Sequence, residues 1–140
     1  MRVIGINFTK MFGERFNKKA KELKIWNEIN IKSIEEIESG PVKIKESLIE
    51  ISFYYNVLYE PELAKVSFEG NLLMAVDPKE GKEIIKSWKN KNLDEETKVL
   101  FFNIILKKVS LKALQIEEEL NLPPHFNLPS LRASSKEEKK

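Results

Sequence analysis

The stretch "LIEISFYYNVLYEPELAKVSFEGNLLM", residues 48 to 74, has an apolar or small residue at every second position over two consecutive runs. In the first run these side chains occupy odd positions and are Ile49, Ile51, Phe53, Tyr55, Val57 and Tyr59. In the second run the even positions repeat the pattern at Ala64, Val66, Phe68, Gly70, Leu72 and Met74. A period of two is typical of a strand that buries one face. Because "EPEL", residues 60 to 63, supplies a turn between the runs, the stretch predicts an antiparallel hairpin.

Two further strands are predicted upstream of this hairpin. Apolar side chains share even positions at Ile4, Ile6, Phe8, Phe12 and Phe16, and odd positions at Leu23, Ile25, Ile29 and Ile31. The basic connector "NKKAK", residues 17 to 21, separates the two series. Around "SIEEIESGP", residues 33 to 41, the second series slips in phase before Gly40 and Pro41, as a bulge followed by a turn would. Four strands are therefore expected before any helix.

The second half of the chain changes to a helical period. The segment "DPKEGKEIIKSWKNKN", residues 77 to 92, predicts a short helix with Asp77 as its N-cap and Pro78 at its first position. Asp94 then opens a longer helix. Its expected apolar stripe consists of Val99, Phe102, Leu106, Val109, Ala113, Ile116 and Leu120. This helix should end where Asn121 adopts a left-handed cap conformation and Pro123 prevents continuation.

These elements predict an α+β fold, in which a four-stranded antiparallel sheet is followed by a short and a long helix packed on it. A single domain is expected over residues 1 to 132, because 140 residues with 41% hydrophobic content fit one modest core. The charged terminus, residues 133 to 140, is expected to be disordered.

The start of the long helix predicts contact with a second subunit. In "VLFFNIIL", residues 99 to 106, only Asn103 is polar, so the first two turns are apolar on every side. A helix of this kind must be enclosed, and one small sheet covers only one of its faces. We therefore expect an oligomer interface at Val99, Phe101, Phe102 and Ile105. A deep intrachain core is the alternative interpretation.

Composition gives little basis for catalysis. The chain has no cysteine and one histidine, His125, and its five glycines form no phosphate-binding loop. The carboxylates of Glu35, Glu36, Glu38 and residues 117 to 119 lie in charged runs and are interpreted as solvated. We expect no enzyme activity, no catalytic residue, no metal site and no cofactor. The absence of a long apolar run or signal peptide predicts a cytosolic protein without a membrane span.

Aromatic side chains instead favour a binding function. Trp26, Tyr54 and Leu58 fall on the strand positions opposite the main apolar series, so the second face of the sheet is partly apolar. That face is either an oligomer interface or an apolar groove. The segment "NLPPHFNLPSL", residues 121 to 131, combines three prolines with large apolar side chains. It is too apolar for a solvated tail, so an apolar surface must receive it.

The order of these elements, together with the proline-rich segment, resembles the SecB-like export chaperones and is most similar to their archaeal branch. The resemblance rests on "SFYYNVLYEPELAKVSFEG", residues 52 to 70, and "LNLPPHFNLP", residues 120 to 129. In the second stretch the matching residues are Leu122, Pro123, Phe126, Leu128 and Pro129. The resemblance implies a homo-oligomer, a dimer or dimer of dimers, that holds unfolded polypeptides in apolar grooves without hydrolysing ATP.

The resemblance leaves the client open, between general export and a dedicated toxin–antitoxin pair. The net charge of +2 argues against a SecA-type motor as partner, because the bacterial members are acidic. The expected client-binding residues are Phe12, Phe16, Trp26, Tyr54, Phe126 and Leu128, and core or subunit packing is the alternative role of each.

A nucleic-acid-binding module is the alternative function. The basic clusters "NKKAKELK", residues 17 to 24, and "LKKVSLK", residues 106 to 112, would supply charge. Phe16 and Trp26 flank the first cluster and would stack on bases. The nearly balanced net charge argues against this alternative, and so do the apolar positions interspersed in both clusters.

Overall fold

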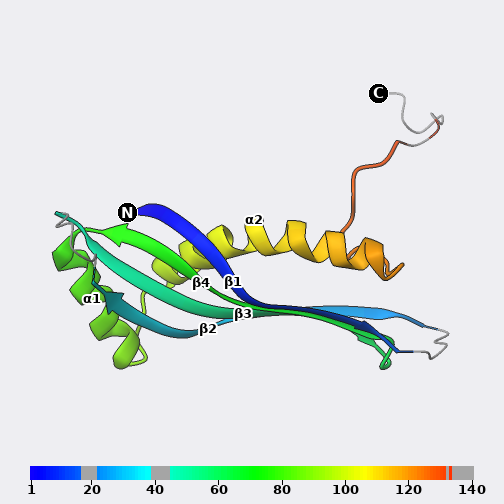
Figure 1. Cartoon of the computed structure of the whole chain (residues 1–140), viewed down its shortest axis with the longest axis horizontal. Helices are drawn as coiled ribbons and strands as arrows, with labels where there is room; N and C mark the ends of the chain where they lie inside the picture. The colour runs from blue at the N-terminus through cyan, green and yellow to red at the C-terminus, as the bar shows by residue number, and fades with distance from the viewer. Residues whose placement is uncertain (17–21, 39–44, 132, 134–140) are drawn as a thin grey trace.

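The computed structural model describes residues 1–16, 22–38, 45–131 and 133, which form four strands followed by two helices (Figure 1). The strands are β1 (Arg2–Arg15), β2 (Lys24–Ile37), β3 (Ser47–Glu60) and β4 (Ala64–Val76). The helices are α1 (Pro78–Lys89) and α2 (Glu95–Glu119). This order of elements confirms the α+β fold expected from the sequence. The predicted connector at residues 17–21 and the turn at Gly40 and Pro41 lie outside the described residues.

All four strands pair antiparallel in one sheet, in the order β1-β4-β3-β2. The hairpin predicted from residues 48 to 74 is present as β3 and β4, in which Phe53 lies opposite Gly70 and Tyr59 opposite Ala64. Figure 1 shows a long twisted sheet, with α2 running along it and α1 at one end. One sheet face, here called the helix face, packs against both helices; the other is called the open face.

The core lies between the helix face and the two helices. The odd-numbered side chains of β3 from Ile49 to Tyr59 are all fully buried, as the period of two predicted. Helix α2 packs mainly on β4 and β1, and α1 on β2 and β3. A Cβ added at Gly13 of β1 would lie 2.4 Å from Ile116 Cγ2, so α2 lies directly on the β1 backbone there.

The helix ends follow the sequence signals. The Asp77 carboxylate accepts from the Lys79 N–H at 3.2 Å, and the Asp94 carboxylate accepts from the Thr97 N–H at 3.3 Å. Asn121 ends α2 with φ of 55°, as predicted. Within the described part of the chain, neither helix is both long and apolar enough to cross a membrane.

A bulge in β2 fits the predicted phase slip, and a bulge in β1 corrects a prediction. In β2 the register shifts between Ile31 and Ser33. In β1 it shifts between Phe8, which lies opposite Gly70, and Lys10, so that Phe12 lies opposite Ser67 rather than a helix-face residue. Phe12 therefore leaves the face of Phe8, and the expectation that all the even positions from Ile4 to Phe16 share one face is wrong. An inserted residue reverses the alternation of every later side chain.

The buried stripe of α2 also differs from the expected one. The residues of α2 that face the core are Phe101, Ile105, Val109, Ala113 and Glu117, spaced at intervals of four. Phe102 and Leu106 are only half-buried, and Val99 is exposed. The apolar run from residue 99 to 106 contains no charged residue that would mark the solvent side, so its phase could not be read from the sequence.

Candidate functional site

Trp26 is the most exposed aromatic side chain on the open face. It lies on β2 opposite Leu58 of β3, and its exposed fraction is 55%. Leu58 is half-buried beside it, so the pair forms a small apolar surface at one edge of the sheet. This position confirms the expectation that Trp26 and Leu58 share the face opposite the buried β3 series.

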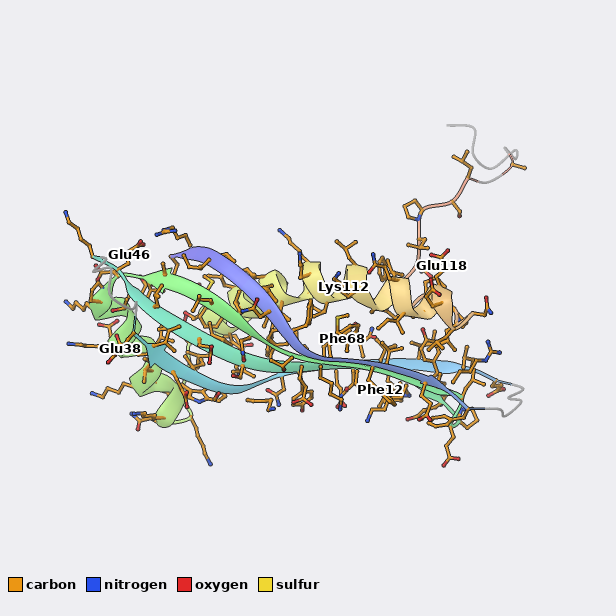
Figure 2. The ribbon with its side chains drawn as sticks, in the orientation of Figure 1. Phe12, Glu38, Glu46, Phe68, Lys112 and Glu118 are labelled. Carbon is orange, nitrogen blue, oxygen red and sulfur yellow. The ribbon has the colours of Figure 1, made fainter. Side chains whose placement is uncertain are left out.

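A second exposed aromatic surface lies at the opposite edge of the open face. Phe12 of β1 is 40% exposed, and the Lys10 ammonium lies 5.9 Å from the centre of its ring. Phe16, at the end of β1, is 37% exposed, and its N–H donates to Leu63 O at 2.7 Å. Figure 2 shows Phe12 on the opposite side of the sheet from Phe68, which points toward α2.

Polar side chains separate these two apolar surfaces. Phe12 lies opposite Ser67, which lies opposite Asn56, which in turn lies opposite Glu28. The outer strands are three strand spacings apart, or about 14 Å. Between Phe12 and Trp26 the centre of the open face is therefore polar, and the structure does not join these two side chains into one groove.

The polar centre includes a charged cluster around Glu69. Its carboxylate lies 2.7 Å from Lys32 Nζ and 3.6 Å from Lys10 Nζ. The hydrogen bond and charge of Lys32 lower the pKa of Glu69. These residues line a hollow of about 340 Å³ that also includes Tyr54, Lys65 and Ser67. Tyr54, one of the expected client-binding residues, is half-buried in this polar hollow.

On the helix side, the C-terminus of α2 is fastened to the sheet. Arg15 Nη1 donates to the carbonyls of Leu120 and Asn121, at 3.0 and 2.9 Å. Leu122 is 6% exposed, and its N–H donates to Glu117 O at 2.8 Å. Tyr59 Oη donates to Pro123 O. The start of the proline-rich segment therefore lies against β3.

A buried acid–imidazole pair holds the next residue of this segment. His125 Nδ1 lies 2.8 Å from Glu117 Oε2, and the two side chains are 3% and 1% exposed. The backbone N–H of His125 also donates to Glu117 Oε1 at 3.2 Å. The interpretation of Glu117 as a solvated carboxylate is therefore wrong, although Glu118 and Glu119 are exposed as expected. Neither side chain of the pair is accessible to solvent while residues 122 to 126 lie in this position.

The pKa values of two tyrosines of β3 are affected by this pair. The ring of Tyr55 lies 6.1 Å from the His125 ring, and its hydroxyl donates to Asn27 Oδ1 at 3.3 Å. Burial, with a smaller contribution from the negative charge of Glu117, raises the pKa of Tyr55 to about 12. Burial and the same charge raise the pKa of Tyr59. Both hydroxyls therefore stay protonated, and remain donors, at neutral pH.

Beyond His125 the apolar side chains are exposed. Phe126 is 44% exposed and makes an edge-to-face contact with the His125 ring at 4.8 Å. Leu128 is 50% exposed and Leu131 is fully exposed. Because His125 packs on the helix face, the expected client-binding residues Phe126 and Leu128 lie on the other side of the sheet from Trp26 and Tyr54.

The predicted oligomer interface is only partly available. Phe101 and Ile105 are 0% exposed in the chain's own core, so they cannot contact another subunit and their assignment is corrected. Val99 and Leu100 are 45% and 40% exposed on the opposite side of the helix, and Phe102 is half-buried. Leu111, further along α2, is 63% exposed.

The surface expected for nucleic acid is not assembled by the described residues. Phe16 follows β1 and Trp26 lies on β2, and these are the two outer strands of the sheet. Stacking on both rings by adjacent bases would require them to be neighbours. Lys107 and Lys108 are exposed on α2, whereas the lysines of residues 17–21 lie outside the described residues.

No family model matches this chain, and no curated protein matches its sequence. Its structure is similar to that of the Mycobacterium tuberculosis Rv1957 SecB-like chaperone in complex with a ChAD peptide from the Rv1956 HigA1 antitoxin. The two superpose with a TM-score of 0.51 over 96% of this chain and 92% of that one, at 16% sequence identity. The fold is SecB-like. At this sequence identity the similarity shows a shared fold only. In both proteins a four-stranded antiparallel sheet is followed by two helices.

Sequence reasoning missed the buried Glu117–His125 pair, although one signal points to it. Glu117 continues the interval of four that begins at Phe101 and passes through Ile105, Val109 and Ala113. A correct phase for α2 would have placed this carboxylate among core residues. A buried carboxylate requires a partner, and a lone histidine in an apolar segment is a suitable one.

Proposed function

We propose that this protein is an ATP-independent holdase chaperone that binds unfolded polypeptides at its exposed apolar surfaces. The observation that carries the proposal is the exposure of large apolar side chains on both sides of one SecB-like sheet. Trp26 and Phe12 lie on the open face, and Phe126 with Leu128 lies beyond the helix face. The M. tuberculosis neighbour, whose structure contains a bound peptide, supports polypeptide as the ligand class.

Holding at these surfaces would depend on several weak contacts. Complete burial of one large apolar side chain contributes about 1.5 to 3 kcal/mol, so a single exposed surface binds a client segment weakly. A long unfolded chain contacts several such surfaces at once, and each contact raises the effective concentration for the next. The polar centre of the open face also offers hydrogen bonds to the polar backbone of an extended client.

We propose that the chaperone acts as a homo-oligomer, either a dimer or a dimer of dimers. Support comes from the exposed side of α2, where Val99, Leu100 and Leu111 are uncovered in a single chain. A second copy of the chain would bury this side of α2, because apolar side chains that pack against each other across an interface are both removed from water. Between general export and a dedicated antitoxin client, the peptide in the M. tuberculosis complex makes an antitoxin segment the first client to test.

An aggregation assay tests the proposal. The purified protein is added to a slowly folding substrate protein without nucleotide, and light scattering is followed at about 50 and about 200 mM salt. Holding should suppress scattering equally at both salt concentrations, because apolar burial depends little on ionic strength. Nucleic-acid binding, measured with a labelled single strand, should be weak and lost at the higher salt concentration.

Substitution tests the open face within the same assay. Trp26→Ala should reduce suppression, because it removes the most exposed aromatic side chain of that face. Met11→Ala is the comparison on the helix face, where Met11 is 53% exposed opposite Phe68, and it should reduce suppression less than Trp26→Ala because the side chain that it removes is smaller and not aromatic. Absence of suppression by the unmodified protein at several-fold excess would overturn the holdase proposal.

A further inference from the structure

The helix face of β3 is covered in two different ways along its length. Near its start, a Cβ added at Gly81 of α1 would lie 3.8 Å from Ile49 Cγ2, so α1 covers that end. Tyr59 lies about 33 Å further along the strand. There the cover includes the non-helical segment Leu122–Phe126, here called the strap, which bends at His125 and Phe126 and lies against Tyr55 and Tyr59. A non-helical piece of chain therefore occupies a place that a helix fills at the other end.

The contacts of the strap are ones that a peptide segment of another chain could also make. Leu122 inserts an aliphatic side chain that is 6% exposed, and His125 lies edge-on to the Tyr55 ring. Tyr59 donates to a backbone carbonyl, that of Pro123, rather than to a side chain. Every residue offers a backbone carbonyl, so this contact would accept many sequences.

A polar pair of side chains holds the strap in place, although the pair is buried. The Glu117–His125 pair, here called the clasp, is 1% and 3% exposed, and His125 Nε2 has no hydrogen-bond partner among the described residues. Burying such a pair is costly, and apolar residues of similar volume often give equal or greater stability. The described charged and titratable groups around the strap are Tyr55 and Tyr59 of β3, Arg15 of β1, and Glu117. Arg15 donates to the carbonyls of residues 120 and 121 rather than to the clasp.

We infer that the strap is a displaceable internal occupant of a peptide site on β3, and that Glu117 and His125 are positioning residues that hold it there. The inference rests on the proposed function and adds its regulation. The site accepts an extended apolar segment with leucine, proline and aromatic residues. A client segment takes the place of Leu122–Phe126, and the displaced strap then leaves the surface of β3. In the resting chain the strap competes with clients in cis.

Because the strap competes with added peptide, a substitution that weakens the strap should increase the affinity for that peptide. His125→Gln weakens the strap but leaves Glu117, Tyr55 and Tyr59 in place for a peptide added in trans. Apparent affinity rises in proportion to the fraction of open sites. The full chain with His125→Gln should bind a labelled synthetic peptide of residues 120 to 131, "LNLPPHFNLPSL", about tenfold more tightly than the unmodified chain. Fluorescence anisotropy measures the affinity.

Glu117→Gln separates the clasp from a general loss of stability. It weakens the strap and the added peptide alike, because both lose the same partner, so the apparent affinity should change little. Glu118→Gln is the matched control one position along α2, where the side chain is exposed, and should change nothing. A role confined to stability would instead make His125→Gln and Glu117→Gln equivalent.

Leu122→Ala provides an independent variant if His125→Gln does not fold. It removes a strap side chain and leaves the site intact, so it should also tighten peptide binding. It should also speed hydrogen exchange of the backbone amide at position 122, which donates to Glu117 O. If folded forms of these variants bind the peptide no more tightly than the unmodified chain, the strap inference is wrong. The holdase proposal would still stand if the unmodified protein suppressed aggregation, and it would fail separately if it did not.

Discussion

Burial and the charge of the buried Glu117 carboxylate raise the pKa values of both Tyr55 and Tyr59. Both hydroxyls are protonated donors, one to Asn27 and one to the Pro123 carbonyl. Ionising either would put a second negative charge beside Glu117 in a region of low dielectric. The folded structure at this end of the sheet therefore requires both tyrosines to be protonated.

The raised pKa values predict a loss of stability in alkali. A free tyrosine ionises near pH 10, whereas Tyr55 keeps its proton to about pH 12 in the folded chain. The folded state therefore binds more protons than the unfolded state above about pH 10, and the free energy of unfolding falls by about 1.4 kcal/mol per pH unit for each such tyrosine. Urea unfolding followed by circular dichroism between about pH 8 and about pH 11 measures the slope.

Tyr55→Phe provides the test of this assignment, because it removes one ionisable group and should reduce the alkaline slope. Tyr54→Phe changes the neighbouring side chain on the open face and leaves the buried pair untouched. Equal slopes for the unmodified chain and for Tyr55→Phe would contradict the assignment.

At the scale of elements, the close approach of α2 to β1 depends on one missing side chain. Gly13 faces Ile116 and Leu120 of α2, whereas Gly5, also on β1, has no atom within 4 Å of an added Cβ. Arg15, two residues after Gly13, donates to the carbonyls at the end of the same helix. The C-terminal half of α2, and the strap that follows it, are therefore positioned by the end of β1.

Gly13→Ala should destabilise the protein by about 1 to 3 kcal/mol, because the new methyl group forces α2 away from the sheet. Gly5→Ala is the matched control on the same strand and should change the free energy of unfolding by less than about 0.5 kcal/mol. Chemical denaturation measures both values. Equal effects of the two substitutions would show that α2 does not press on β1 at Gly13.

At the scale of the whole molecule, apolar surface remains uncovered on α2 after the single chain has folded. Val99 and Leu100 lie on that side and are exposed, while Phe101 and Ile105 fill the core. The proposed oligomer would cover this surface and leave the open face for clients.

Leu100→Glu should break this assembly without unfolding the chain, because it places a charge in an apolar interface but disturbs no buried contact. Gln115→Glu adds the same charge at an exposed position further along α2 and should leave assembly intact. Light scattering at micromolar concentration measures the size of the particle. A monomeric unmodified protein would contradict the oligomer, and Phe102→Glu is less informative because Phe102 also packs on the core.

Local chemistry allowed most of the fold to be predicted. Strict alternation from Ile49 to Tyr59 specifies a strand, and Asp77, Asp94 and Asn121 mark helix ends through hydrogen bonds that involve only nearby residues. The exposure of Trp26 beside Leu58 also follows from alternation alone. The Trp26 and Leu58 part of the open face was therefore predictable once β2 and β3 were assigned, whereas the place of Phe12 was not.

The sequence by itself determined the order of strands and helices, the pairing of β3 with β4 and the surplus of apolar side chains. Only the tertiary structure decided that Phe12 turns to the open face, that Phe101 rather than Phe102 fills the core, and that Glu117 meets His125 beneath the strap. Element types depend on the periodicity of neighbouring residues, which is written along the chain. Faces, phases and buried partners depend on where an inserted strand residue or a packed helix places side chains far apart in sequence, and these are fixed only when the elements pack together.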